Sequence, residues 1–369
     1  MTLKTRRILL VSYMADHPYL SHLASLLHGY GFEIHHYIIA RCELKNNGEL
    51  ISRVARPKKR IGWFTGILYM HRWLKKVPAF DFIHFHYSHI IYWPLQYWWH
   101  RFAYHFLHTI WGSDFYRTAS WRQSIFYRFY LKMDGISFAN SKTRDAFALK
   151  YPRLSNRLHT ARFGLTSLDF IDKIESDENK SDWCRYLKLP ENLPIVCLGY
   201  NASPTHQHLP VLDVLKKYYQ TDHPYHLVLL LTYGNTDDLY FEKIKQSLDT
   251  APFAYTMVTN YLKPEDLARL RLATAVLIHV PVTDQLSAAF QEALYCGSQV
   301  IAGNWLPYQD LKERGITWHD IGKMEDVGPV LRTLLIKGVT APRFQREIAE
   351  LSGWNAVIGQ WVRFYEEYD

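Results

Sequence analysis

Residues 275–303 read AVLIHVPVTDQLSAAFQEALYCGSQVIAG. The opening run AVLIHV is short, aliphatic and unbroken, which is typical of a strand buried on both faces of a parallel sheet. A polar loop follows, and the segment from Leu286 to Cys296 then has the character of a helix that Gly297 ends. A second apolar run occupies residues 299–302. This stretch therefore predicts a strand, a helix and a parallel strand, the repeating unit of an α/β fold.

The same alternation extends toward the N-terminus. The series that directly precedes residue 275 has strand candidates at residues 195–199, 227–232 and 254–258. An earlier series has a helical pattern at residues 19–30 and strand candidates at residues 7–12, 32–40, 82–86, 106–110 and 135–139. The charged, proline-containing segment 169–194 separates the two series and is the best candidate for a linker. We expect an N-terminal domain over residues 1–168, a C-terminal domain over residues 193–340, and helices over residues 341–369.

The composition limits the class of partner. The chain has 369 residues, a formal net charge of +8, and 12 Trp, 26 Tyr and 19 Phe. A basic protein favours an acidic partner, such as nucleic acid, an anionic membrane surface or a phosphorylated substrate. The four cysteines show neither C-x-x-C nor zinc-site spacing, so we expect reduced, buried thiols in a cytosolic protein. The first residues lack the pattern of a signal peptide, and we expect no membrane-spanning helix.

The loop and helix start within residues 284–292 form the strongest candidate for a ligand site. Ligands of open α/β sheets bind beyond the carboxyl ends of the strands, and a helix N-terminus suits a phosphate. Glu292 is placed to accept hydrogen bonds from ribose hydroxyls, and Asp284 to accept them from sugar hydroxyls. An ordinary strand–helix–strand unit with surface acids is the alternative. The residues expected to seat a diphosphate are Gln285, Leu286, Ser287 and Ala288.

This segment resembles a known donor signature. An acid, seven residues and a glutamate, followed by Ala, a small-residue turn and a short strand, look like the motif of glycosyltransferase family 4. That family has Glu where this chain has Asp284, and its G-F-G run is Gln285-Leu286-Ser287 here. The resemblance implies the GT-B fold, in which two Rossmann-like domains face each other across a cleft. It also implies a nucleotide-sugar donor in the C-terminal domain and a final helix that crosses back to the N-terminal domain.

A second resemblance is spread over residues 84–310. The segment HTIWGSDFYR at residues 108–117 is similar to a W-G-x-D-x-Y motif of bacterial transferases that add 4-acetamido-4,6-dideoxygalactose to enterobacterial common antigen. Residues 198–208, 233–240 and 307–310 look like three further segments of that family, in the same order. The resemblance implies transfer of a hexose or a deoxyaminosugar to a saccharide or polyprenyl-diphosphate-linked acceptor in bacterial envelope polysaccharide synthesis. Inverting and retaining stereochemistry both stay open.

Two loops after strands of the C-terminal domain add donor candidates. Family 4 usually places Arg and Lys near the first of these loops, and this chain does not, so His206 or His208 is expected to supply the positive or hydrogen-bonding group. Gly234 permits the positive φ of a tight turn over a ligand. A polar helix cap and a plain turn are the alternatives. The donor-binding candidates in these loops are Gly199, Asn201, His206, His208, Tyr233, Gly234 and Asn235.

The N-terminal domain supplies candidates for a catalytic base. Asp114 follows a predicted strand, and it either contacts the acceptor as a base or caps the next helix. His17, beside Asp16, is a second candidate base. His84 and His86 share one strand face, where core histidines are favoured over a metal pair because a third ligand is not evident. We expect neither a metal nor a cofactor, and we list Asp284 with Asp114 and His17 as catalytic candidates.

The segment from Trp93 to Lys132 has an unusual composition. It holds 15 aromatic residues, five Lys or Arg, and a single acid. Such a mix is typical of an interfacial surface on an anionic membrane, and basic Arg53–Arg60 belongs to the same candidate surface. The alternative is that the aromatics are core and the basic residues are solvated. The membrane interpretation implies a cytoplasmic protein held peripherally on the inner membrane.

Three other functions fit parts of the sequence. A sugar-nucleotide epimerase uses the same scaffold without an acceptor sugar. A nucleic-acid-binding protein is suggested by charge alone, but no recognised motif supports it, and we expect no nucleic acid partner. A non-catalytic binding subunit is suggested by the altered family 4 motif.

Overall fold

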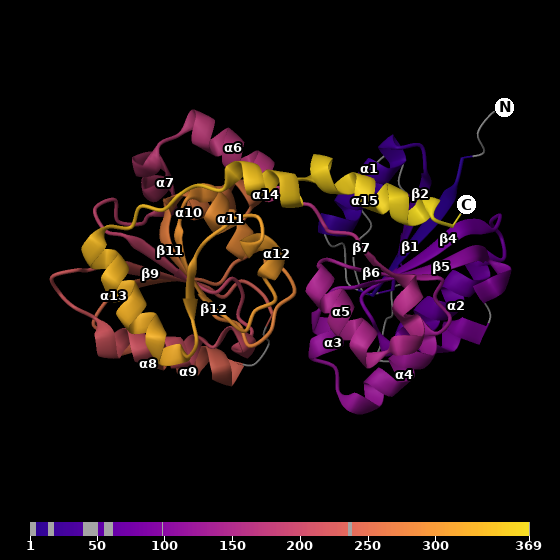
Figure 1. Ribbon diagram of the computed structural model, residues 1–369, viewed down its shortest axis with the longest axis horizontal. Helices are drawn as coiled ribbons and strands as arrows, with labels where there is room; N and C mark the ends of the chain where they lie inside the picture. The colour runs from indigo at the N-terminus through magenta and orange to yellow at the C-terminus, as the bar shows by residue number, and fades with distance from the viewer. Residues whose placement is uncertain are drawn as a thin grey trace. The chain divides into compact units, whose positions relative to one another are not determined.

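The computed structural model describes residues 5–13, 18–39, 51–54, 62–97, 99–234 and 238–368. The chain divides into two compact units (Figure 1). Unit 1 comprises residues 1–164 and 354–369, and unit 2 comprises residues 165–353. The candidates His17 and Asn235, and residues 55–60 of the basic segment, lie outside the described residues.

Unit 1 is built on a seven-stranded sheet with the order β3-β2-β1-β4-β5-β6-β7, and every pair of neighbours is parallel. Its strands are β1 (Arg7–Ser12), β2 (Glu33–Ile38), β3 (Ile51–Val54), β4 (Phe80–His86), β5 (Ala103–Ile110), β6 (Gly135–Phe138) and β7 (Leu158–Thr160). Its helices are α1 (Pro18–Gly29), α2 (Gly62–Leu74), α3 (Ser113–Tyr116), α4 (Ser120–Tyr130), α5 (Ser141–Lys150) and α15 (Trp354–Glu366), with 3-10 turns η1 (Ile90–Tyr97), η2 (Trp99–Arg101) and η3 (Pro152–Arg157).

Unit 2 is built on a six-stranded parallel sheet with the order β10-β9-β8-β11-β12-β13. Its strands are β8 (Ile195–Leu198), β9 (His226–Leu230), β10 (Ala254–Val258), β11 (Thr274–His279), β12 (Gln299–Gly303) and β13 (His319–Ile321). Its helices are α6 (Ser167–Asp177), α7 (Lys180–Leu187), α8 (His208–Tyr218), α9 (Asp238–Asp249), α10 (Pro264–Ala273), α11 (Ala288–Cys296), α12 (Gln309–Lys312), α13 (Val327–Lys337) and α14 (Gln345–Ser352), with 3-10 turns η4 (Pro204–His206) and η5 (Met324–Asp326).

Both sheets are covered by helices on both faces, which explains their unbroken aliphatic strands. Alternate residues of β1 fall into different apolar clusters: Ile8 and Leu10 pack in one, Leu9 and Val11 in the other. The residues of β8 divide in the same way. The expectation of two Rossmann-like α/β domains is therefore confirmed.

The expectation of a linker over residues 169–194 is wrong. Residues 167–187 form α6 and α7, which both contact α10 within unit 2. Leu168, Ile171 and Ile174 recur at helical spacing and are buried. The charged residues that suggested a linker include those on the outer face of this amphipathic helix. Unit 2 therefore begins at Leu165.

The last two helices of the chain belong to different units. Helix α14 belongs to unit 2, and α15 belongs to unit 1, with the division at Gly353. Trp361, Phe364 and Tyr365 of α15 are buried in the apolar cluster that includes Ile8 and Leu10 of β1. The last helix of the chain is thus part of the core of the first unit.

Candidate active site

In the sheet of unit 2, the chain adds strands outward from β8 on one side (β9, β10) and outward from β11 on the other (β12, β13). The crevice between the two strands where the order switches in this way binds ligands in open α/β sheets. The loops that follow these two strands are joined to each other. The backbone N–H of Val282 donates to the carbonyl of Thr205 over 2.8 Å. The side-chain amide of Gln207 donates to the carbonyl of Val280 over 2.7 Å. The candidates of both loops therefore lie at one edge of the sheet.

The loops after β8 and β9 pack closely against each other. The backbone N–H of Ala202 donates to the carbonyl of Tyr233 over 2.6 Å. Gly234 has φ +93°, and a Cβ built on it would lie 3.1 Å from Oδ1 of Asn201. Gly199 also has a positive φ, and its Cα faces His208. The predicted glycines are therefore required by backbone conformation and by close approach of the two loops.

His206 ends η4 in the loop after β8, His208 begins α8, and both side chains are buried. Nδ1 of His208 lies 2.9 Å from the hydroxyl of Tyr240. Burial lowers the pKa of His208 to about 4, against a smaller opposing effect of the Asn201 backbone. The imidazole of His208 is consequently neutral near pH 7, so it offers a hydrogen bond and not a positive charge. The loops themselves add no cationic side chain, because residues 199–208, 231–234 and 280–288 contain no Lys or Arg.

Asp284 is fixed in the loop after β11. The hydroxyl of Tyr308 donates to its Oδ2 over 2.6 Å, and Nε2 of His279 lies 3.4 Å from the same oxygen. Its Oδ1 accepts from the backbone N–H of Gln285 over 2.8 Å. Burial opposes ionisation, but the hydrogen bonds from His279, Tyr308 and Gln285 outweigh it and lower the pKa of Asp284. The site therefore holds one aspartate as an anion.

Helix α11 begins at Ala288, two residues later than expected from the sequence. Ser287 caps it, since its hydroxyl accepts from the backbone N–H of Phe290 over 3.3 Å. Gln285 and Leu286 thus lie in the loop before the helix. Gly297 ends the helix in the left-handed conformation, as the sequence predicts.

Glu292 is already engaged by two donors within unit 2. Its Oε1 accepts from the hydroxyl of Ser167 over 2.5 Å, and its Oε2 accepts from Nε of Arg271 over 2.8 Å. The side chains of Glu292 and Arg271 are only 5% and 3% exposed. Sequence reasoning missed both partners, although Arg271 stands between two leucines at the end of a predicted helix. A contact between Glu292 and a ribose stays a prediction. For such a contact, the ribose hydroxyls would have to share the Glu292 carboxylate with Arg271, which already neutralises it.

Two tyrosines offer exposed rings at this edge. Tyr233 follows β9 and Tyr261 follows β10, and their side chains are 50% and 71% exposed. Their ring centroids lie 6.4 Å apart. Sequence reasoning selected Tyr233 but not Tyr261, although Tyr261 occupies the corresponding place three residues after a strand. Exposed aromatic rings of this kind can stack on a planar ligand.

The base candidate Asp114 of unit 1 is buried and joins two loops. Its Oδ2 accepts from the backbone N–H of Ser88 over 2.7 Å, and its Oδ1 accepts from that of Trp111 over 2.9 Å. Burial raises the pKa of Asp114 to about 6, against the lowering effect of these hydrogen bonds. Asp114 lies in the first turn of α3. It is thus placed at the carboxyl edge of the sheet, where it holds the loops after β4 and β5 together.

The strand histidines lie in the core of unit 1. Nδ1 of His84 is 2.6 Å from the hydroxyl of Tyr365, and its Nε2 is 2.7 Å from that of Thr109. His86 is fully buried with its ring centroid 4.2 Å from that of His84. The described part of the chain contains no group of three or more His, Cys, Asp or Glu that could hold a metal ion.

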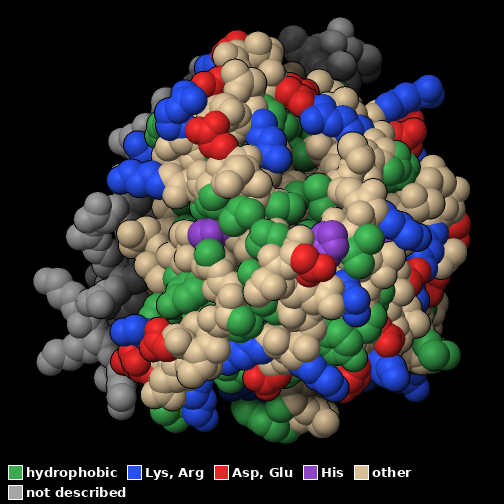
Figure 2. Space-filling view, turned by 90° about the vertical axis from the view of Figure 1, so that its left-hand side faces the viewer, with side chains coloured by type: hydrophobic (Ala, Val, Ile, Leu, Met, Phe, Trp, Pro, Cys, Tyr) green, Lys and Arg blue, Asp and Glu red, His purple; other side chains and the backbone are tan. Residues whose placement is uncertain are grey.

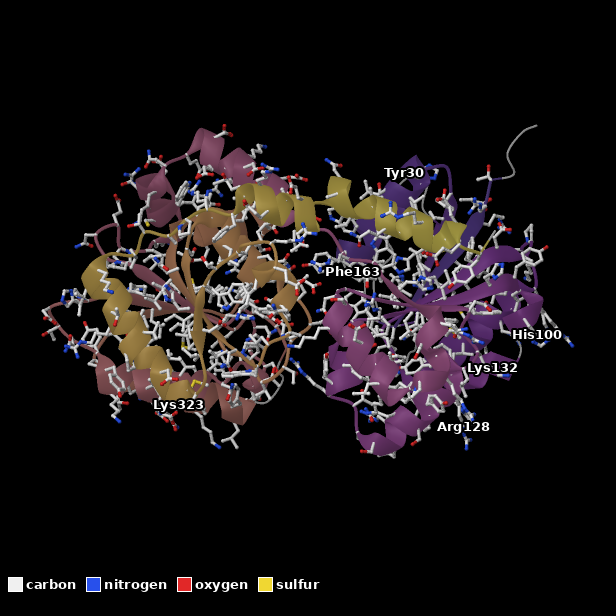
Figure 3. All side chains as sticks on the ribbon, in the orientation of Figure 1. Tyr30, His100, Arg128, Lys132, Phe163 and Lys323 are labelled. Carbon is white, nitrogen blue, oxygen red and sulfur yellow. The ribbon has the colours of Figure 1, made fainter. Side chains whose placement is uncertain are left out.

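The aromatic segment of unit 1 divides between core and surface. Phe126, Phe129 and Tyr130 of α4 are buried, whereas Trp121 is 58% exposed and carries Arg122 over its ring at 5.1 Å. Arg128 and Lys132 are exposed and project outward at and just beyond the end of α4 (Figure 3). On the side of the molecule shown in Figure 2, by contrast, acidic and basic side chains are interspersed. Among the described helices, none is long and apolar enough to cross a membrane.

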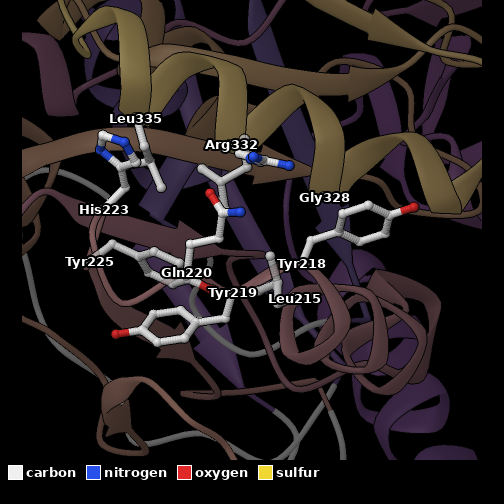
Figure 4. Close-up of a pocket in the computed structure, with 10 residues that line it drawn as sticks. Leu215, Tyr218, Tyr219, Gln220, His223, Tyr225, Gly328, Arg332 and Leu335 are labelled. Atoms are coloured by element: carbon white, nitrogen blue, oxygen red, sulfur yellow. The ribbon is translucent and has the colours of Figure 1, made fainter.

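A depression between α8 and α13 lies before the start of β9, at the opposite edge of the sheet from the loops above (Figure 4). Tyr218, Tyr219, Tyr225 and Arg332 are among its lining residues. It encloses about 10 Å³, which is room for roughly one water molecule. Because this depression is so small, the candidate ligand site remains at the carboxyl edge of the sheet.

Two parallel α/β units in one chain, with loops gathered at the carboxyl edges of both sheets, define the GT-B fold. No family model and no curated protein sequence matches the chain. Among solved structures, it is similar to a sucrose-phosphate synthase from Thermosynechococcus elongatus, with a TM-score of 0.77, 16% identity and 98% of each chain covered.

Two further solved structures share the fold. HepE from Anabaena in complex with UDP has a TM-score of 0.76 at 12% identity, over 98% of this chain and 100% of that one. WaaG, a glycosyltransferase involved in lipopolysaccharide biosynthesis, has a TM-score of 0.66 at 13% identity, over 98% of this chain and 99% of that one. A structure of HepE in complex with UDP-glucose is also similar, with a TM-score of 0.72 at 12% identity.

Proposed function

We propose that this protein is a glycosyltransferase that takes a sugar from a nucleotide-sugar donor bound at the carboxyl edge of unit 2. The observation that supports it most is the continuous set of contacts between the loops after five neighbouring strands. The rings of Tyr261 and Tyr233 lie next to each other. The backbone N–H of Ala202 donates to the carbonyl of Tyr233, and that of Val282 donates to the carbonyl of Thr205. The last link is the indole N–H of Trp305, which donates to the carbonyl of Pro281 over 2.8 Å. Ligands of open α/β sheets bind in the crevice beyond the carboxyl ends of the strands, and these loops lie at that edge.

The donor parts are assigned along this edge. Tyr233 and Tyr261 stack on the nucleobase, and Asp284 accepts from a hydroxyl of the sugar. The diphosphate is held by hydrogen bonds and by the start of α11, because the flanking loops lack Lys and Arg. No metal takes part in this proposal. Asn235, outside the described residues, stays a donor-binding candidate. The described residues proposed around the diphosphate are Gly199, Asn201, His206, His208, Gly234, Gln285, Leu286, Ser287 and Ala288.

Transfer then needs a base and an acceptor, which we assign to unit 1. Asp114, with its pKa raised to about 6, is one base candidate, and His17, which lies outside the described residues, is the other. The acceptor is a saccharide, most simply one carried on a polyprenyl diphosphate for envelope polysaccharide synthesis. The exposed Trp121, Arg122, Arg128 and Lys132 of unit 1 support peripheral binding to an anionic membrane surface.

The proposal is tested by a thermal-shift screen with UDP, GDP, dTDP and CMP. A nucleotide that binds only the folded protein at a hundred times its Kd adds about 2.7 kcal/mol, which corresponds to roughly 5 °C or more for domains of this size. We expect one nucleotide to give such a shift. Absence of any shift across the four nucleotides would contradict the proposed donor.

A pair of glycine variants localises the binding. Gly234 and Gly338 both have φ +93°, but a Cβ at Gly234 meets Asn201 while one at Gly338 meets nothing within 4 Å. Gly234→Val should abolish the nucleotide shift, whereas Gly338→Val should keep it. Equal shifts in both variants would place the nucleotide elsewhere.

A further inference from the structure

Three stacked rings lie beneath the loop of Asp284. Tyr200 follows β8, His279 ends β11 and Tyr308 follows β12, and these three strands are neighbours in the sheet. The ring centroids of Tyr200 and His279 are 5.9 Å apart at an interplanar angle of 17°, and those of His279 and Tyr308 are 5.9 Å apart at 22°. His279 is fully buried and Tyr308 is 2% exposed. His279 and Tyr308 are therefore shielded from water, whereas Tyr200 is partly exposed.

The hydrogen bonds in this layer have a direction. An ionised carboxylate only accepts, so Tyr308 donates its proton to Oδ2 of Asp284 over 2.6 Å. The phenol oxygen is then free to accept, and Nε2 of His279 lies 2.8 Å from it. Nε2 consequently carries a proton, which it donates to the phenol oxygen. Nδ1 of His279 has no hydrogen-bond partner among the described residues.

This chain of donors fixes Asp284 in one orientation. Oδ2 is held by the relay and Oδ1 by the backbone N–H of Gln285. The side chain of Asp284 is still 14% exposed, whereas that of His279 is not exposed at all. Part of the Asp284 side chain is thus accessible from solvent, whereas His279 behind it is not.

We propose that His279 and Tyr308 form a hydrogen-bond relay that positions Asp284 to accept from the sugar of the donor. The inference rests on the proposed donor site and deepens it, because it assigns the sugar-contacting function to a set of three residues. His279 and Tyr308 are positioning residues, since they act through Asp284. They set affinity for the sugar part of the donor and leave the nucleotide part unaffected.

The test compares binding of UDP and UDP-glucose by calorimetry in matched tyrosine variants. Tyr308→Phe removes the hydroxyl that holds Asp284. Tyr295→Phe removes a hydroxyl that donates to Asp172 over 2.7 Å between α11 and α6, and it serves as the control. We expect Tyr308→Phe to weaken UDP-glucose by about tenfold, the usual effect of losing a hydrogen bond to a charged group, and to change UDP by less than about twofold. Tyr295→Phe should leave the ratio of the two affinities unchanged.

A second pair of variants guards against a folding defect. His279→Gln keeps a nitrogen donor near the position of Nε2, whereas His279→Leu removes it. The glutamine variant should retain most of the wild-type ratio of UDP-glucose to UDP affinity, and the leucine variant should lose it. A merely structural histidine would give the same ratio in both variants.

Two failures are distinguishable. If the wild-type protein binds neither UDP nor UDP-glucose, the proposed donor site is overturned in its uridine form, and the relay is overturned with it. If the wild type binds both and Tyr308→Phe keeps the ratio seen in Tyr295→Phe, the relay is overturned while the donor site stands.

Discussion

At the scale of single residues, the ion pair of Glu292 and Arg271 changes how the donor motif is understood. A ribose-binding glutamate needs an open carboxylate, yet here both oxygens accept from groups of unit 2. A buried carboxylate is tolerable because a cation neutralises it, and removing one member leaves the other charge unpaired. Loss of activity on mutation of Glu292 would therefore not by itself identify a donor contact.

We expect Glu292→Ala to destabilise unit 2 by about 3–5 kcal/mol, because the Arg271 guanidinium stays buried without its partner. The control is Glu178→Ala, which breaks a more exposed pair with Arg269 and should cost about 1 kcal/mol. Urea unfolding of both variants measures the difference. Comparable stabilities for the two variants would show that the Glu292 pair is not a buried structural contact.

At the scale of secondary-structure elements, the ends of helices are set by glycines with positive φ. Gly297 ends α11 at φ +78°, and a Cβ built on it would lie 2.6 Å from Cγ of Arg343. Arg343 is itself held, since its Nη1 lies 2.5 Å from Oε1 of Glu175. The cap thus joins the candidate donor helix to the segment before α14.

Gly297→Ala should cost about 2–3 kcal/mol, as the sum of left-handed strain and displacement of Arg343. Gly315 has the same φ of +78° with nothing within 4 Å of its Cβ position. Gly315→Ala should therefore cost only the strain, about 1 kcal/mol. Thermal or urea unfolding separates the two contributions, and equal losses would mean that Arg343 moves aside freely.

The exposed surface of α4 predicts a charge-dependent interaction with lipid. The double variant Arg128→Glu, Lys132→Glu should lower binding to phosphatidylglycerol vesicles by about tenfold or more at low salt, because each basic residue near an anionic surface contributes about 1 kcal/mol. The matched control is Lys323→Glu, Arg332→Glu, which makes the same charge change at exposed positions of unit 2. Vesicle sedimentation measures the binding. Equal losses in both double variants would indicate a non-specific charge effect.

At the scale of the whole molecule, each sheet forms a core that depends on segments far apart in the chain. Unit 1 is completed by α15, whose Val357, Trp361 and Tyr365 are fully buried in it. The same unit buries several histidines, among them His84, His86 and His108. Imidazoles that must stay neutral make its stability depend on pH.

Burial lowers the pKa of His108 to about 3, and it lowers the pKa of His84 and His86 as well. Below pH 6.5 the unfolded chain binds protons that the folded chain refuses, so stability is complete above that pH and falls as the pH drops. For His108 alone the loss by pH 5 is about 2 kcal/mol. Asp114 has the opposite effect on stability. Burial raises its pKa to about 6, so the folded chain binds this proton at a higher pH than the unfolded chain does. Three histidines outweigh one aspartate, so unfolding by urea should be easier at pH 5 than at pH 7.

The histidine contribution is isolated by two variants. His108→Gln should reduce the slope of stability against pH by about one proton. His100→Gln, at an exposed position, serves as the matched control. A stability that is constant between pH 7 and pH 5 would contradict neutral buried histidines.

Local pattern alone predicted most of the strands, although it missed β3, β7 and β13, and it predicted most of the loops that gather at the carboxyl edge of unit 2. Unbroken aliphatic runs such as residues 227–230 and punctuating residues such as Gly297 act through backbone propensity and burial, which depend on neighbours in the chain. Gly199, Asn201 and Gly234 were found in the same way, since each follows a strand. The candidate loops were thus within reach of sequence reasoning.

The tertiary structure decided which of those loop residues have partners. Asp284 is held by Tyr308, which lies 24 residues away in the chain, and Glu292 is neutralised by Arg271, which lies 21 residues away. It also decided that residues 167–187 are packed helices and that α15 completes unit 1. These facts depend on which side chains meet across elements, and no local period encodes such a meeting. The sequence determined where polar groups lie along the chain, and only the folded packing determined which of them are already bound and which remain open to a ligand.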